Sequence, residues 1–414
     1  MGRFARYIST LVLLGIAGCS TQTIFPSSRL DISSAATQEA SGQTNSKQRL
    51  TVLYTFTGRP NGAFPHGSLT YVNGRFFGAT DEGGRSFCSE FTGCGTIYAI
   101  TPSGKRERVL HEFSRKKDYS DGQFPNGGLL YEDGTFYGTT SGEGAGNGIL
   151  FSVFCQTGRC VEKVLKNVGG IPNGDLVEEN GTFYGTTQMG GPSFYGTVFT
   201  AAPSGEVNTL YSFKGGSDGE RPFAGLTDVN GTFYGTTGGQ PYGPGTVFKI
   251  TPSGEETVLH QFGGTSEGAR DGTQPSSKMI DVNGTLYGTT SWGGAHQLGT
   301  VFSITTSGIE RVVYSFAGDH DGENPASPLI SANGALYGET GQGGASGNGT
   351  IYEINGSGGE HVLYNFKGGV GGANPGGGLF KLHGFLYGTT SNGGNYSDCL
   401  VFGTGCGTFF RMRL

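Results

Sequence analysis

Acidic side chains gather in four short stretches of this sequence, and carboxylates are the residues here whose spacing could do chemistry. They are Asp118 and Asp121, Asp218 and Glu220, Asp271, and the group Asp319, Asp321 and Glu323. Two carboxyl groups that flank a glycosidic bond can hydrolyse it, and carboxylates at a loop cluster can bind calcium or sugar hydroxyls. Asp-Gly is first of all a turn former, so a structural role is the simpler interpretation.

Other signatures of catalysis or metal binding do not occur. The seven histidines form no His-x-His and no His-Glu-x-x-His, and the sequence has no Gly-x-Ser-x-Gly. Neither a zinc hydrolase nor a serine hydrolase is therefore indicated. We assign no catalytic residue, no metal ligand and no cofactor.

Six of the seven cysteines fall into close pairs, and the seventh is Cys19. An even number of locally paired cysteines in an exported chain predicts small disulfide loops. Zinc is the alternative, but spacings of five to seven residues without nearby histidines fit its ligand patterns poorly. The predicted disulfides are Cys88 to Cys94, Cys155 to Cys160 and Cys399 to Cys406.

Residues 1–18 predict an export signal, with Arg3 and Arg6 before an apolar run over 8–16 that is too short to span a bilayer. The end of this segment, Ala17-Gly18-Cys19, resembles the lipobox of bacterial lipoproteins. The resemblance implies acylation of Cys19 and, with Ser20 behind it, an outer-membrane location facing either the periplasm or the medium. Residues 19–48 are rich in Ser, Thr, Gln and Ala without an apolar period, which predicts a flexible tether.

Composition limits the partners and the fold class. The formal net charge is −6, which argues against nucleic acid and against anionic lipid surfaces as ligands. Glycine is unusually frequent at 80 residues, and it comes with 29 Phe and 19 Tyr. This combination indicates many tight turns between short strands that still bury large side chains.

A phrase of turn, Gly, any residue, Phe or Leu, an aromatic residue and Gly recurs seven times, 47 to 60 residues apart. It stands at residues 74–78, 134–138, 181–185, 231–235, 284–288, 334–338 and 384–388. Each unit divides into four expected strands, which in the fourth unit are 225–229, 232–237, 246–251 and 256–262. Asn-Gly pairs between the first two strands predict type I′ turns, and Ser-Gly pairs join the last two. We interpret the phrase as inter-blade core, with its Tyr packed between blades.

Four antiparallel strands repeated at this period predict an all-β protein, a single β-propeller of seven blades over residues 49–414. The last unit lacks a fourth strand, and an extra strand at 50–56 precedes the first unit. We expect the N-terminal strand to complete the C-terminal blade and close the ring. A monomer is expected.

The residues also carry a family resemblance. Leu286-Tyr287-Gly288-Thr289-Thr290-Ser291, residues 299–304 and residues 312–316 resemble the GloVer tandem repeat of exported bacterial proteins. The resemblance implies architecture and a surface location only, because the family has no assigned biochemical activity.

The loops that join the second strand to the third, and one unit to the next, should emerge on one face of the ring. We expect length variation, the disulfides and exposed aromatic residues on that face, and a ligand near blades four to six. The predicted ligand-binding residues are Tyr242, Trp292, His296, His320 and Asp321, with Phe194 and Tyr396 as further exposed aromatics. These features favour a binding or scaffold module for a carbohydrate or an envelope protein. A polysaccharide-acting enzyme with carboxylates at the channel mouth is the alternative.

Overall fold

The computed structural model describes residues 50–86, 88, 93–114, 122–142, 148–156, 159–239, 243–263, 270–318, 320–394, 399 and 404–414. The leader, Cys19 and the tether lie outside the described residues. The described chain has no helix that is both long and apolar enough to cross a membrane. Its architecture is all-β, with two short 3-10 turns at Gly216–Asp218 and Gly369–Gly371.

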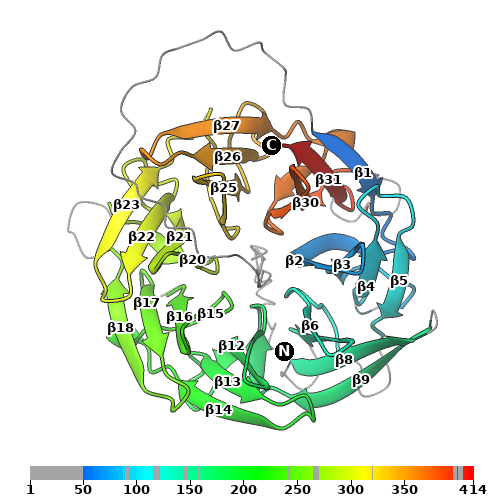
Figure 1. Ribbon diagram of the computed structural model, residues 1–414, viewed down its shortest axis with the longest axis horizontal. Helices are drawn as coiled ribbons and strands as arrows, with labels where there is room; N and C mark the ends of the chain where they lie inside the picture. The colour runs from blue at the N-terminus through cyan, green and yellow to red at the C-terminus, as the bar shows by residue number, and fades with distance from the viewer. Residues whose placement is uncertain are drawn as a thin grey trace, which may run out of the picture.

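Seven antiparallel sheets stand in a ring, as expected for a seven-bladed propeller, and the central axis of this ring is called the channel below (Figure 1). Blade one contains β2 (Ala63–Val72), β3 (Arg75–Glu82), β4 (Thr96–Ile100) and β5 (Arg108–Glu112). Blade two contains β6 (Leu130–Glu132), β7 (Thr135–Thr140), β8 (Ile149–Gln156) and β9 (Arg159–Asn167). Blade three contains β10 (Gly170–Pro172), β11 (Val177–Glu179), β12 (Thr182–Gly190), β13 (Thr197–Ala201) and β14 (Val207–Ser212). In each blade the first strand is innermost.

The remaining blades repeat this order. Blade four contains β15 (Thr227–Val229), β16 (Thr232–Thr237), β17 (Thr246–Ile250) and β18 (Glu256–Gln261). Blade five contains β19 (Thr273–Pro275), β20 (Ile280–Val282), β21 (Thr285–Trp292), β22 (Thr300–Thr305) and β23 (Glu310–Ser315). Blade six contains β24 (Ile330–Ala332), β25 (Ala335–Thr340), β26 (Thr350–Ile354) and β27 (Glu360–Asn365). Blade seven contains β28 (Ala373–Pro375), β29 (Phe380–Leu382), β30 (Phe385–Asn392), β31 (Thr408–Arg413) and the N-terminal β1 (Thr51–Thr55).

The ring closes as the sequence predicts. β1 pairs antiparallel with β31, so that Thr51 lies opposite Arg411 and Thr55 opposite Thr408. Phe56, which follows β1, is fully buried and packs edge-to-face on Tyr98 of blade one, with ring centroids 5.1 Å apart. The first and last segments of the propeller therefore share one sheet, and that sheet contacts blade one.

The turns between the first two strands have the backbone that Asn-Gly favours. Asn230 and Gly231 have φ of 54° and 78°, and the equivalent pair in every blade also has two positive values, as a type I′ turn requires. Asp133 and His383 take the first turn position in blades two and seven. Each turn holds its two strands in a fixed register.

The aromatic phrase forms the inter-blade core, as predicted. Tyr184 of blade three lies 4.0 Å from Phe233 of blade four, measured between ring centroids, and both side chains are buried. In six blades a Phe follows the outer strand and adds a second contact, and in blade two Val168 takes this position. Phe213 of blade three, for example, packs edge-to-face on Phe248 of blade four. Such contacts bury large aromatic side chains between neighbouring blades and make the propeller rigid.

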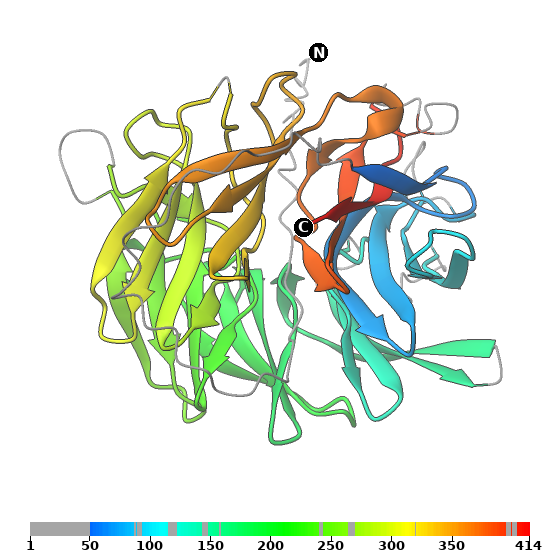
Figure 2. The same cartoon turned by 45° about the horizontal axis from the view of Figure 1, so that its top comes forward.

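The three disulfides are the pairs expected from the sequence: Cys88 to Cys94, Cys155 to Cys160 and Cys399 to Cys406. The expectation that they and the length variation lie on one face is wrong for blade two. There Cys155 and Cys160 staple the tip of the β8–β9 hairpin, which belongs to the opposite face and extends beyond the rim of the ring (Figures 1 and 2). Phe154 and Val161, a cross-strand pair near this tip, are 47% and 56% exposed.

Candidate functional site

A second repeat lies along the innermost strands of the seven blades. Each blade has a proline, a variable residue, a small residue (Gly, Ala or Ser), a second variable residue and then Leu or Met, as in Pro172-Asn173-Gly174-Asp175-Leu176. The proline and the aliphatic residue recur in all seven blades, whereas the second and fourth positions change from blade to blade. The constant residues of the motif therefore hold the fold, and the two changing positions are the ones that make one blade differ from the next.

The variable positions form a bulge. In blade three Pro172 pairs with Thr187 and Val177 with Tyr184, so that four inner residues, 173–176, lie opposite two residues of β12. Blades five and seven show the same pairing. Bulges lift the chain off the sheet and re-aim side chains, often beside binding sites.

We call the residues at the fourth position of this motif the channel tier. They are Ser68, Gly128, Asp175, Gly225, Lys278, Pro328 and Gly378. Two of the seven are charged, and both are buried, Asp175 at 2% exposed and Lys278 at 5%. The tier therefore carries one anion in blade three and one cation in blade five, on either side of a glycine in blade four.

Neighbouring blades hold the Asp175 carboxylate in place. Its Oδ1 accepts a hydrogen bond from the Gly128 N–H of blade two, and the Ser68 hydroxyl of blade one approaches the same carboxylate. A Cβ at Gly128 would overlap this carboxylate, so the neighbouring position has to be glycine. Burial raises the pKa of Asp175 to about 6, while the charge of Lys278, the Gly128 hydrogen bond and the nearby Ser68 hydroxyl lower it.

Polar and aromatic side chains occupy the second position of the motif and contact the ends of the second strands. Asn126 donates to Asn173 Oδ1 at 2.7 Å, and Asn173 donates to Gln188 Oε1 at 2.6 Å. Phe223 of blade four is half-buried, and its ring covers the backbone of Gly238. The second position therefore contributes amide groups in blades two and three and an aromatic ring in blade four.

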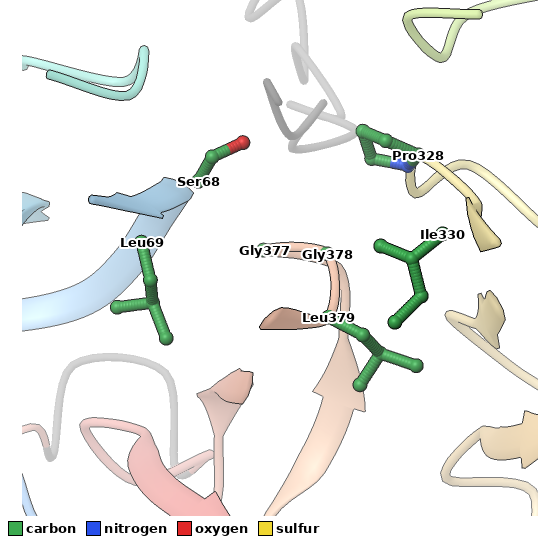
Figure 3. A pocket seen from close by; sticks show the side chains of 7 residues that line it. All are labelled: Ser68, Leu69, Pro328, Ile330, Gly377, Gly378 and Leu379. Carbon is green, nitrogen blue, oxygen red and sulfur yellow. The ribbon is translucent and has the colours of Figure 1, made fainter. Parts of the chain in front are cut away.

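A small hollow opens in the channel wall where blades six, seven and one meet (Figure 3). It is lined by Ser68, Leu69, Pro328, Ile330 and Gly377 to Leu379. Next to it, the Gly378 N–H donates to Glu339 Oε2 at 3.1 Å. Glu339 replaces the threonine that most blades have on the second strand, and complete burial raises its pKa to about 8.

The structure describes four of the five predicted ligand residues, and they lie at the loops of blade five and between blades five and six. Trp292 ends β21 and is 39% exposed, opposite Thr273 of β19. His296 is exposed on the loop that follows it, and His320 is exposed on the loop after β23. Tyr242, like Tyr396, lies outside the described residues. Phe194 is 69% exposed on the corresponding loop of blade three.

Asp321, predicted as a ligand residue, has structural partners. Its Oδ2 accepts hydrogen bonds from the Tyr314 hydroxyl at 2.7 Å and from the Ala317 N–H at 3.0 Å. Asp218 binds Tyr211 and the Lys214 N–H in the same way, and Asp271 binds His260 and the Gly263 N–H. These three carboxylates close the loops that lead to the next blade. Asp118, Asp121 and Asp319 lie outside the described residues.

Carboxylate chemistry at the channel mouth gains no support from these contacts. Within the described ranges, no three His, Cys, Asp or Glu side chains are grouped closely enough to hold a metal ion. Asp175, Phe223 and Lys278 were not among the predicted site residues. They could have been found from the second and fourth positions of the proline motif, which differ between blades. This variation is visible only when the seven copies of the motif are aligned.

Two solved structures resemble the fold of this chain with TM-scores of 0.51 and 0.50. A europium-containing methanol dehydrogenase is 11% identical, with a TM-score of 0.51 over 89% of this chain and 94% of that one. A puromycin hydrolase variant in complex with PGG is 15% identical, with a TM-score of 0.50 over 80% of this chain and 50% of that one. TolB from Acinetobacter baumannii is 11% identical, with a TM-score of 0.38 over 64% of this chain and 58% of that one. This chain therefore spans about half the length of the hydrolase and of TolB, and no curated protein matches its sequence.

Family membership rests on the repeat. The family model of the Gloeobacter/Verrucomicrobia repeat matches residues 42–240 and again residues 236–413. The two matches together cover all seven blades, from the closing strand to the last one. The chain belongs to the Gloeobacter/Verrucomicrobia repeat family.

Proposed function

We propose that this chain is a binding protein that takes a carbohydrate ligand at the channel mouth and on the adjoining loops. The proposal rests on the contrast between the residues that repeat in every blade and the inner-strand positions that differ from blade to blade. Prolines, glycines and core rings repeat in every blade, whereas the second and fourth positions of the inner motif bring together amides, hydroxyls, two charges and an aromatic ring. Sugar sites combine such polar groups with an aromatic face.

Trp292 extends this surface outward. An indole that is 39% exposed at the end of β21 can cover the apolar face of a sugar ring. It lies in blade five, the blade that also contributes Lys278 to the channel tier. A ligand that starts in the channel mouth could therefore continue over the loops of that blade.

The test is affinity electrophoresis of the full chain in a panel of neutral and acidic polysaccharides, with chromatography of the products. We expect retardation without product release. Trp292→Ala should reduce the retardation while the melting temperature changes little. The matched control is Phe194→Ala, which removes another exposed aromatic residue from the same face and should leave the retardation unchanged. Release of oligosaccharides would favour the enzyme, and migration unchanged in every polysaccharide would refute the proposal.

We further propose that the ring is tethered to the outer membrane through acylated Cys19. The lipobox-like sequence before Cys19 and the polar stretch behind it support this proposal. Mass spectrometry of the N-terminal peptide should show a lipidated cysteine. Cys19→Ala should release the protein from the membrane fraction, and an unmodified Cys19 in the membrane-bound protein would contradict the assignment.

A further inference from the structure

The β8–β9 hairpin of blade two differs from the corresponding hairpins in length and in composition. β8 and β9 have eight and nine residues, whereas the third and fourth strands of the other blades have five or six. An exposed apolar pair, Phe154 with Val161, takes the place that polar residues have in blade four. There the turn begins, closed by a hydrogen bond from the Thr251 N–H to the Glu255 carbonyl oxygen. Blade two therefore carries apolar side chains on a length of hairpin that the other blades lack.

This hairpin has one covered face and one free face. The Cys155–Cys160 disulfide packs on a core cluster that also includes Leu110 of blade one. Side chains alternate along a strand, so Phe154 and Val161 point to the other face, where they are 47% and 56% exposed. The two side chains form an apolar row across the hairpin that remains open to solvent.

Cations stand on both sides of this row. Arg159 and Lys163 lie two residues before and two residues after Val161, so they share its face of β9, and both are exposed. Neither forms an ion pair within the described ranges. Glu162 is the one carboxylate between residues 149 and 167, and it points to the opposite face. The free face is therefore locally basic on a chain whose formal net charge is −6.

The backbone of β9 is open on its outer side. The sheet has the order β6-β7-β8-β9, so β9 is an edge strand and every second residue along it directs its N–H and C=O groups outward. The last part of β9 is flanked by the turn of blade three, where a Cβ at Gly205 would lie 3.2 Å from the Leu165 carbonyl oxygen. Residues 159–163 come before this contact, in the part of the hairpin that extends past the rim (Figures 1 and 2). An extended segment of another chain can pair with such an edge through main-chain hydrogen bonds.

We propose that β9 accepts an acidic strand of a partner protein at residues 159–163. In antiparallel register a branched aliphatic residue of that strand lies opposite Val161 and lengthens the apolar row. Carboxylates two residues before and two residues after it lie opposite Lys163 and Arg159. A second copy of this chain does not fit, because the register that matches Val161 with itself puts Arg159 opposite Lys163. This surface lies apart from Trp292 and does not depend on the proposed carbohydrate binding.

The test is fluorescence anisotropy of a labelled peptide, Thr-Glu-Thr-Val-Thr-Glu-Thr, added to the full chain. We expect it to bind about tenfold more tightly than the same peptide with Lys in place of Glu. Phe154→Ser and Val161→Ser should each weaken its binding about fivefold. The double variant Arg159→Glu and Lys163→Glu should reverse the preference, so that the lysine peptide binds more tightly. The matched control is Ile309→Ser, which removes a 59% exposed aliphatic side chain from the position of blade five that corresponds to Val161, and it should change nothing.

Amide hydrogen exchange separates strand addition from a looser surface contact. Exchange over residues 159–163 should slow in the complex, because outward N–H groups of β9 gain acceptors. Unchanged exchange there would overturn the proposal, and so would equal affinity for the two peptides. Binding of the native chain to mixed phosphatidylethanolamine and phosphatidylglycerol vesicles that Phe154→Ser abolishes would instead make this face a membrane contact. A dimer of the native chain that Val161→Ser disperses would assign the face to a second copy, and either result refutes the partner strand.

Discussion

The ring of Phe248 on β17 fills the space that a side chain at Gly235 on β16 would need. The two residues are cross-strand partners, and Leu226 of the inner strand closes the same space. The equivalent aromatic residue and glycine are paired in all seven blades, from Tyr98 with Gly78 to Phe410 with Gly388. The last glycine of the recurring phrase is therefore a packing requirement, and it makes the phrase a structural signature.

Gly235→Ala should destabilise the protein strongly for this reason. A methyl group placed against the Phe248 ring forces a shift in a well-packed core, which costs about 1–3 kcal/mol. Thermal unfolding followed by circular dichroism measures the effect. Gly371→Ala is the matched control, because nothing lies within 4 Å of a Cβ at Gly371. If the two variants melt at the same temperature, the packing explanation is wrong.

The closing strand gives a second prediction. Deletion of residues 1–57 removes β1 and Phe56, and so exposes the edge of β31 together with the core around Tyr98. Unpaired edges promote aggregation, so the truncated chain should aggregate or melt well below the native protein. Deletion of residues 2–48 is the control, because it leaves β1 intact, and it should melt like the native chain. Cooperative melting of both truncations at the native temperature would show that β1 does not close the ring.

The fold could be predicted further than the site because the two depend on different residues. Asn230-Gly231, Gly235 and the aromatic residues recur in register, so period and turn chemistry were sufficient to predict seven closed blades. The channel tier depends on residues that do not recur. Asp175 and Lys278 are 103 residues apart in sequence, and the ring brings them close enough for their charges to interact. Asp321 was predicted as a ligand residue but has a structural role, because it accepts a hydrogen bond from Tyr314 on the preceding strand.

Two of the disulfides should differ in their effect on stability. Cys406 is fully buried in a core cluster with Phe56 and Phe76, whereas Cys155 and Cys160 staple a hairpin tip beside exposed side chains. Replacing Cys399 and Cys406 by serine should lower the melting temperature by several degrees, because it buries a hydroxyl in that cluster. The same double change at Cys155 and Cys160 should lower it little, since a loop this short contributes roughly 2 kcal/mol at most when only chain entropy is counted. Differential scanning calorimetry of both variants tests the difference, and equal losses would contradict it.

The last prediction concerns pH and the outer contacts of blades three to six. Glu256, Glu310 and Glu360 begin the outer strands of blades four, five and six, and each faces the loop carboxylate of the preceding blade, Asp218, Asp271 or Asp321. Burial first, and then the neighbouring aspartate, raises the pKa of each glutamate from 4.5 to about 7. In the folded protein these glutamates hold protons that the unfolded chain has already released at pH 5 to 7.

A group whose pKa is raised in the folded state contributes stability that is complete below the unfolded pKa and is lost as the pH rises through the folded value. The native protein should therefore melt at a lower temperature at pH 8 than at pH 5. The triple variant Glu256→Gln, Glu310→Gln and Glu360→Gln should melt a few degrees above the native protein at pH 8 and close to it at pH 4.5, because amides carry no charge to bury. Glu339, whose pKa is raised to about 8, should leave a further loss of stability at higher pH in both proteins. Glu255→Gln changes the exposed neighbour of Glu256 and serves as the control, which should follow the native profile at every pH. A triple variant whose melting temperature falls with pH as steeply as the native one would show that these carboxyl groups do not hold protons in the folded ring.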